Sequence, residues 1–364
     1  MSGGKSENKT DVSTFKNFSA APRFSVLNKW FSKKMFTELG TAISGNFYKT
    51  KDVTKALPFP SKDNQTEYSI ALNMGIGKGR LENVTDMQNA LWLYKSLVAV
   101  KSLSATLSAD DLNGLGQSIT KGNNTRVLDL RKRTQFLLST VDSFLQQKGL
   151  ITKTDIIYFS NLNDILFFAF NNPRLAGTEK FIRLTPAITG WNNEQANGNG
   201  INKYKHRFNT QSLILSSGFS KYIPANLIHQ NNYGASLKLA YIFTDLSERF
   251  FTNGAVSNEI KAKADIKQAG INLFYQHAVY PNTRTAINFS LQSEMGYQDA
   301  FTKKEFYGIA SFSGTFNYFI SYRTRLICNL GASYQKNYYD INQNAALLTD
   351  NIRLFANAGV EIAL

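Results

Sequence analysis

The 364-residue sequence contains few of the residues on which disulfides, metal sites and histidine catalysis depend. It has one cysteine, Cys328, and three histidines, which excludes an intrachain disulfide framework and a cysteine-rich zinc module. The longest uncharged apolar run, residues 165–170, is far shorter than the ~18 residues of a transmembrane helix. Proline is also scarce, whereas aromatic residues make up 13% of the chain, which is too many for a disordered polypeptide.

The chain carries an excess of positive charge, with 41 Lys and Arg against 26 Asp and Glu. These basic residues are dispersed along the sequence, and no nucleic-acid-binding module is recognisable. We therefore expect no nucleic-acid partner. A positive surface of this kind also suits the anionic headgroups of lipids.

The dominant pattern is alternation of apolar and polar residues over unusually long segments. The C-terminal segment places one set of apolar residues on a single face of a strand: Ile352, Leu354, Ala356, Ala358, Val360, Ile362 and Leu364. Strands of soluble proteins average about 5–6 residues, whereas segments of about 10–16 residues match strands that cross a bilayer at a tilt. About eleven segments alternate in this way: 14–27, 34–49, 64–78, 180–192, 205–220, 228–245, 263–279, 284–298, 304–319, 323–339 and 350–364.

The connections between these segments alternate in length. Short ones are expected at 28–33, 221–225, 281–284 and 321–323, and longer polar ones near 50–63, 193–204, 246–262 and 340–349. Aromatic residues lie near both ends of the segments, for example Trp30 and Tyr280 by short turns and Trp191, Tyr204 and Tyr241 by long loops. Short periplasmic turns, long external loops and two aromatic girdles are typical of outer-membrane β-barrels. The fold class predicted is thus an all-β transmembrane antiparallel barrel of about 10–12 strands.

One stretch, residues 84–175, changes to the 3.6-residue period of helices. Thr85 and Gln88 have the spacing of a capping box, a second helix can end at Gly149, and a third is expected between Thr154 and Pro173. The predicted domains are barrel strands over 1–83, a helical insertion over 84–178, and further strands over 179–364. The parity of the connections places the insertion on the periplasmic side.

The start of the chain shows no signal peptide. Counting 14–27 as a strand gives an odd number, whereas bacterial single-chain barrels have even numbers. Two alternatives remain: twelve strands, with a signal peptide and one alternating strand encoded in frame upstream of Met1, or ten strands, with 14–27 outside the barrel. The first also explains the apolar face of Phe18, Ala20, Phe24 and Val26.

Two regions carry a resemblance to a known group. One is the run from Gly75 to Asp86 followed by Ala90-Leu91, and the other comprises 128–131, 142–145 and 158–164. These segments resemble poorly characterised outer-membrane β-barrel proteins of Bacteroidota, in which barrel strands are interrupted by a helical insertion. The resemblance implies the same architecture and localisation in the bacterial outer membrane. It implies no activity.

The candidate catalytic and binding motifs are weak. The glycine-rich run Gly75 to Gly79 lacks the phosphate-loop pattern, and we interpret it as a tight strand exit. His206, His229 and His277 fall on different strands near the rims, and Cys328 shares the apolar face of its strand with Leu326 and Leu330. We predict no catalytic, cofactor-binding or metal-binding residue, and no cofactor.

Charged residues on the polar faces are more informative. Six of them are predicted to face the lumen: Glu38, Arg183, Lys238, Lys267, Glu294 and Arg353. They form either a salt-bridged plug or a small polar pore, because pairing depends on a cross-strand register that the sequence does not show.

Three functions are compatible with this architecture. The first is a narrow porin-like channel or transporter, and the second is an accessory subunit that binds a periplasmic or outer-membrane protein through residues 84–178. A lipid-modifying enzyme that depends on His206 or His229 is the weakest, because the sequence has no recognisable nucleophile motif. We expect a protein that is not an enzyme and that contacts outer-membrane lipids and lipopolysaccharide.

Overall fold

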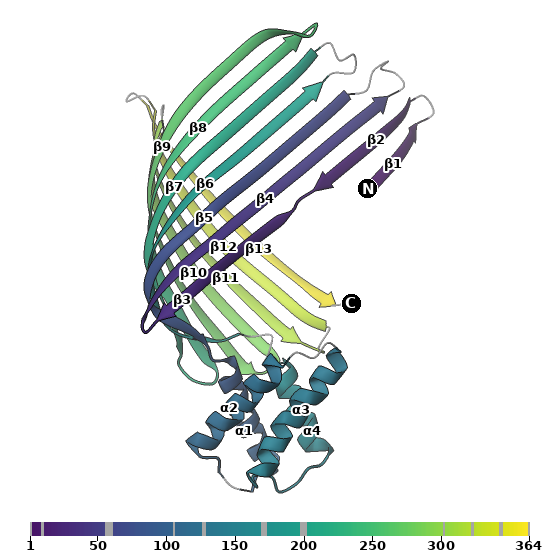
Figure 1. The fold of residues 1–364 in the computed structure, drawn as a ribbon, viewed down its shortest axis with the longest axis vertical. Helices are drawn as coiled ribbons and strands as arrows, with labels where there is room; N and C mark the ends of the chain where they lie inside the picture. Colours follow the sequence, from purple (N-terminus) through teal and green to yellow (C-terminus); the bar gives the residue numbers. More distant parts are fainter. Residues whose placement is uncertain are drawn as a thin grey trace.

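The computed structural model describes residues 2–8, 11–54, 61–104, 106–125, 129–168, 173–196, 202–300, 303–321, 324–341 and 345–362. In these residues, 13 strands form one antiparallel sheet, and a group of four helices lies beneath one end of it (Figure 1). The strands are β1 (Ser2–Asn8), β2 (Asp11–Ala20), β3 (Arg23–Ser32), β4 (Met35–Thr54), β5 (Ser61–Asn83), β6 (Leu175–Ala196), β7 (Asn202–Pro224), β8 (His229–Thr252), β9 (Ala255–Asn282), β10 (Thr285–Ala300), β11 (Lys303–Phe319), β12 (Thr324–Ile341) and β13 (Ala345–Ile362). The helices are α1 (Thr85–Ala99), α2 (Ala109–Asn124), α3 (Leu130–Gln147) and α4 (Ile156–Phe168).

Strand order in the sheet follows the chain, with one exception: β2 and β3 pair with successive halves of β4. Pro22 lies between them and has no N–H for the ladder, although its carbonyl oxygen accepts a hydrogen bond from Gly45 N at 2.9 Å. Together β2 and β3 make one crossing that runs through to Ser32. The prediction of a turn over 28–33 is therefore wrong, and the ten-strand alternative, which removes 14–27 from the sheet, is wrong as well.

Several strands are longer than a bilayer requires. The segment 246–262, expected to be a long loop, instead continues β8 and β9 and contains a two-residue hairpin at Asn253 and Gly254. Both residues have positive φ angles, 55° and 77°, as this type of hairpin turn demands. The prediction failed because strands beyond the bilayer keep their hydrogen bonds but lose apolar alternation.

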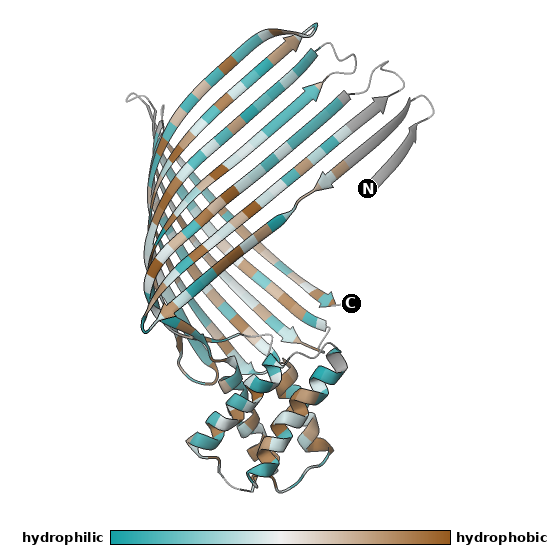
Figure 2. Cartoon of the chain, in the orientation of Figure 1, coloured by the Kyte–Doolittle hydropathy of each residue, from teal (hydrophilic) through white to brown (hydrophobic). Residues whose placement is uncertain are grey.

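The two faces of the sheet differ in chemistry. The inner face is defined here as the one whose side chains bury one another, and it includes Phe36, Glu38, Glu179, Asn232 and Ala278. The outer face carries the exposed apolar side chains, and Figure 2 shows the resulting alternation along the strands. The sheet therefore directs most of its exposed apolar side chains away from the interior, although Leu27, Phe31 and Phe208 face inward.

The apolar part of the outer face has the height of a membrane. On β6 it extends from Lys180 to Asn192 and contains Ile182, Leu184, Pro186, Ile188 and Gly190. On β5 it lies between Lys78 and Thr66, and Lys78 pairs directly with Lys180. A span of about ten residues is what a tilted strand needs to cross the hydrocarbon core. We call this band the apolar belt.

The sheet has two free edges within the described residues. There β13 pairs with β12 alone, and β3 pairs with β4 alone, so an opening separates the first and last crossings (Figure 1). The eleven predicted segments correspond to the crossing made by β2 and β3 and to β4–β13. The short β1, antiparallel to β2, is a twelfth row.

The helices form a separate apolar core of conventional kind. Leu93, Leu97, Leu115, Val141 and Leu145 are fully buried in it. Helix α2 begins with a capping box in which Asp111 N donates to Ser108 Oγ at 3.1 Å and Ser108 N donates to Asp111 Oδ2 at 3.3 Å. None of the helices in the described ranges is long and apolar enough to cross a membrane.

The sequence predictions for these helices were partly confirmed. Gly149, with a φ of 64°, follows α3 as expected, but α2 was not predicted. The Thr85 and Gln88 capping box is wrong, because Thr85 Oγ1 instead accepts a hydrogen bond from Arg174 N at 2.8 Å, where the chain returns to the sheet.

The helical group is attached to the ends of several strands. Arg174 donates to the carbonyl oxygens of Asn226 at 3.2 Å and Leu227 at 2.6 Å, between β7 and β8. Arg284, between β9 and β10, forms an ion pair with Asp164 of α4. These contacts hold the helices against the turns at one end of the sheet.

Candidate functional site

Three of the six predicted lumen residues lie in one row across the inner face. Glu38 is opposite Gly75, which is opposite Arg183, and the row continues through Ser216 to Lys238. Because directly paired residues point to the same side of a sheet, these side chains share the interior.

The row begins with a buried charge cluster, formed by Lys29, Glu38, Glu179 and Arg183. Arg183 Nε donates to Glu38 Oε1 at 2.5 Å, and Lys29 Nζ donates to Glu179 Oε1 at 2.8 Å. Lys29 Nζ also lies 3.6 Å from Glu38 Oε2, whose side chain has no exposed surface. A buried carboxylate requires such partners, because removing it from water is otherwise costly. The four residues therefore act as one ion-pair network.

The glycine-rich motif makes room for this cluster. A Cβ at Gly75 would lie 2.5 Å from Glu38 Oε1, and a Cβ at Gly77 would overlap the Phe36 ring. Both glycines lie within β5, which continues to Asn83. The interpretation of Gly75 to Gly79 as a strand exit is thus wrong; the glycines are places where neighbouring side chains cross the strand.

The other three predicted lumen residues are divided between the faces. The register places Glu294 and Arg353 on the inner face, and Glu294 Oε1 accepts a hydrogen bond from Tyr307 Oη at 3.1 Å. Lys267 pairs with Tyr241 and Asp299, so it lies on the outer face. The expectation that Lys267 faces the lumen is corrected by this register: above the apolar belt the outer face is itself polar.

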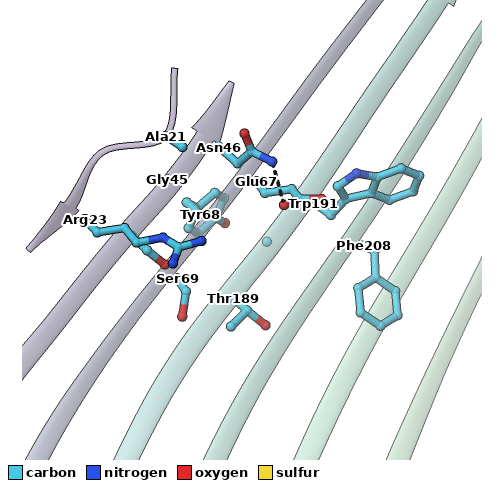
Figure 3. Close-up of a pocket in the computed structure, with 12 residues that line it drawn as sticks. Ala21, Arg23, Gly45, Asn46, Glu67, Tyr68, Ser69, Thr189, Trp191 and Phe208 are labelled. Atoms are coloured by element: carbon cyan, nitrogen blue, oxygen red, sulfur yellow. Dashed lines mark hydrogen bonds between the residues drawn. The ribbon is translucent and has the colours of Figure 1, made fainter. Parts of the chain in front are cut away.

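A hollow of about 410 Å³ lies on the same wall, farther from the helices (Figure 3). Its inner-face residues include Arg23, Glu67, Thr189, Trp191 and Phe208. Glu67 Oε2 accepts a hydrogen bond from Asn46 Nδ2 at 3.3 Å. A guanidinium, a carboxylate and an indole in one hollow can contact a small polar solute from several sides.

A cluster of side chains around His206 lies directly beyond this hollow. His206 Nδ1 is 2.9 Å from Glu248 Oε1 and 3.0 Å from Tyr204 Oη, and its ring is 4.6 Å from that of Trp191. Within the described residues, the His206 ring has Tyr204 and Glu248 as hydrogen-bond partners. Trp191 and Tyr204 were predicted to belong to an outer girdle, but both point inward.

The other two histidines, His229 and His277, lie side by side, which the sequence did not indicate. Their rings stack with centroids 5.4 Å apart, on the outer face near the helices. No group of three His, Cys, Asp or Glu residues that could hold a metal ion occurs among the described residues.

Sequence reasoning missed two members of the charge cluster, Lys29 and Glu179. Lys29 was assigned to a turn. Its odd number, against the even numbers of the apolar Phe24 and Val26, could have placed it on the polar face of a strand. Glu179 immediately precedes the predicted strand 180–192. Lys29 contacts both Glu38 and Glu179, and these contacts depend on the register of the four strands β3–β6.

The apolar belt, the inner charge cluster and the attached helices define the class of the protein: an integral β-barrel of the outer-membrane type with a helical insertion. No family model and no curated protein sequence matches the chain. Solved structures with a similar strand arrangement include the β domain of the Bordetella autotransporter BrkA (7% identity, 100% of this chain and 96% of that chain, TM-score 0.32). The translocator domain of NalP from Neisseria meningitidis also matches (8%, 95% and 87%, TM-score 0.28).

Proposed function

We propose that the protein is a narrow porin-like channel of the outer membrane, which passes small ions or polar solutes without enzymatic chemistry or a cofactor. The observation that carries this proposal is one row of small residues on the inner face. Five directly paired positions on five neighbouring crossings are Ser25, Ala42, Ala71, Ala187 and Ser212.

Small residues matter because a barrel of this size is close to the limit at which side chains fill the interior. The row lies between the charge cluster and the hollow that contains Glu67 and Trp191. It leaves space along the wall, whereas larger residues at these positions would close it.

The charge cluster narrows the path near the helices. Glu38 is neutralised by Lys29 and Arg183, so it offers little free charge to a passing ion. Lys238 and Arg353 are exposed on the inner face and form no ion pair within the described residues. The result is a polar path with a fixed constriction on one wall.

Conductance in planar bilayers tests the channel. The protein should conduct small ions, and Ala42→Trp, which places an indole in the small-residue row, should lower the conductance strongly. The matched control is Ile43→Trp, because Ile43 is the next residue on β4 and lies on the outer face. An absence of conductance in the unaltered protein would overturn the proposal.

A second candidate function is supported by an apolar patch on the helices. Ile156 and Ile157 at the start of α4 are 85% and 53% exposed, and Phe159 is exposed beside them. Exposed apolar patches outside the membrane are typical of protein-binding surfaces. The alternative is an accessory subunit that binds a periplasmic partner through this patch.

Purification in detergent followed by mass spectrometry tests the alternative. A specific partner should co-purify with the unaltered chain and be lost from the double variant I156E/I157E. Gln147→Glu, an exposed change on α3, is the control and should retain the partner. Equal recovery from both variants would remove the patch from consideration.

A further inference from the structure

Two hollows lie one above the other on the outer face of β5–β9. The lower one, the apolar hollow, has a volume of about 490 Å³ and is lined mainly by Ile70, Leu72, Pro186, Ile188, Leu213 and Tyr241. The upper one, the basic hollow, has a volume of about 750 Å³ and is lined in part by Lys205, Arg207, Arg249, Lys261 and Lys263. The first lies within the apolar belt, and the second lies beyond it. The strand ends on that side of the belt are the ones away from the helices (Figure 1).

The hollows adjoin one another along two strands. On β7 the outer-face positions run from Leu213 through Gln211 to Asn209 and Arg207; Gln211 lines the apolar hollow and Asn209 lines the basic one. The residues paired with Gln211 and Asn209 on β8, Phe243 and Asp245, are divided in the same way. From Gln211 to Arg207 is four residues, about 13 Å along a strand.

The ladder between β5 and β6 is interrupted at Pro186, one of the residues that line the apolar hollow. Pro186 has no N–H, and the register contains no pairs between Ala71–Ala187 and Met74–Leu184. A side-chain hydrogen bond from Thr185 Oγ1 to Asn73 Oδ1, at 2.9 Å on the inner face, bridges this gap. The apolar hollow thus lies beside a gap in the strand pairing.

The basic hollow holds more positive than negative charge. Five cationic residues line it, against the carboxylates of Glu194 and Asp245. Lys205 Nζ lies 3.2 Å from a Glu194 oxygen, whereas Arg207 and Lys263 form no ion pair within the described residues. Both are exposed on the outer face. Arg207 donates to the neutral amide oxygen of Asn209, which leaves its charge unpaired, so both cations can contact an anion outside the protein.

We propose that the two hollows form one binding site for a phosphorylated glycolipid of the outer leaflet, the lipid A part of lipopolysaccharide. An acyl chain would lie in the apolar hollow, and the phosphates would contact Arg207 and Lys263. Asparagine amides at Asn64 and Asn192 line the basic hollow and can bond sugar hydroxyls. This amide lining favours a sugar headgroup over the headgroup of a simple phospholipid. The site is independent of conduction through the lumen.

Native mass spectrometry of the full chain in detergent tests this site, with diphosphorylated lipid A as the probe. The double variant R207E/K263E should bind lipid A at least about tenfold more weakly, because it loses two charge-assisted contacts with phosphate. The control is K78E/K180E, the paired lysines of the opposite rim of the same outer face, which should bind lipid A normally. Heat-modifiable migration on gels verifies that each variant is folded.

Three results would overturn the proposal. The first is unchanged lipid A binding by R207E/K263E while the fold is intact. The second is an equal loss in R207E/K263E and K78E/K180E, which would indicate general attraction between charges. The third is phosphatidylglycerol bound as tightly as lipid A, which would assign the hollows to phospholipid.

Discussion

The helices of this protein bury their apolar residues in a core, whereas the sheet exposes most of its apolar residues on the outer face. Leu93 and Leu115 in the helices have no exposed surface, and their neighbours in that core are buried with them. Leu237 on β8 is 45% exposed, and Ile182, Ile188 and Leu213 in the apolar belt are exposed to a similar extent. Buried strand residues lie on the opposite face and include the carboxylates of Glu38 and Glu179.

This difference shows that one chain is adapted to two solvents. In water, apolar side chains gather in a core and the helix surface is polar. In a bilayer, lipid covers the apolar side chains, and only closed hydrogen-bonded structures satisfy the backbone. The same residue type therefore has a different energetic role in each region, and substitutions can measure that difference.

The largest expected effect is the removal of a buried leucine from the helices. Leu93→Ala should lower the free energy of unfolding of the helical region by about 2–5 kcal/mol, because it loses apolar burial and leaves a cavity. Leu237→Ala should cost less, about 2 kcal/mol, because it loses the transfer of its carbons out of water, at about 0.8 kcal/mol per CH₂, but leaves no cavity where lipid fills the space. Urea unfolding followed region by region with hydrogen exchange measures both. Equal costs would mean that the two regions share one kind of core.

A charge placed on the two faces of β8 is the next test. Leu237→Arg, in the apolar belt, should cost about 2–4 kcal/mol, whereas Ser236→Arg, on the inner face, should cost much less. Reversible folding into lipid vesicles at several urea concentrations gives both values. If Ser236→Arg proves the more costly variant, the inner and outer faces have been exchanged.

A buried hydrogen bond between two helices should have a smaller effect. Tyr158 Oη donates to Asp142 Oδ1 at 2.8 Å, and burial, followed by the Asp142 contact, raises the pKa of the Tyr158 phenol. Tyr158→Phe should destabilise the helical region by about 1–2 kcal/mol, as measured by its thermal unfolding. A gain in stability would show that Asp142 is better solvated without this partner.

The smallest effect concerns the start of α2 and depends on pH. Hydrogen bonds from the Ser108 side chain and backbone lower the pKa of the Asp111 carboxyl. The stabilisation is therefore present above the ordinary pKa of an aspartate and is lost as pH falls through the lowered pKa. The gap in thermal stability between the unaltered protein and Asp111→Asn should be seen at pH 7 and should narrow as pH falls below the ordinary aspartate pKa of 3.8. A gap that widens in acid would contradict this assignment.

Alternation made the membrane strands predictable, because every second residue in the belt faces lipid. Cys328 lies with Leu326 and Leu330 on the outer face, as expected, and five of the six predicted lumen residues lie on the inner face. Lys267 was misplaced because β9 continues above the belt, where Lys263, Asp265 and Lys267 share the outer face with Ile271. Polarity identifies the inner face only at the height of the membrane.

The site depends on relations between distant segments. Glu38 and Arg183 are 145 residues apart, and nothing local to either one indicates the other. The two hollows on the outer face likewise depend on the register of β5–β9. Strand identity can be derived from the sequence of each segment, whereas pairing requires the assembled sheet.

The central claim is that lipid covers the odd-numbered residues of β8 between 235 and 241. Spin labels can be attached to single cysteines introduced, after Cys328→Ser, at each of the seven positions from 235 to 241. Each label reports its accessibility to oxygen, which concentrates in lipid, and to a water-soluble nickel complex. The account predicts a period of two, with oxygen favoured at 235, 237, 239 and 241 and the nickel complex at 236, 238 and 240. Accessibility to the nickel complex at all seven positions would contradict a membrane-spanning strand.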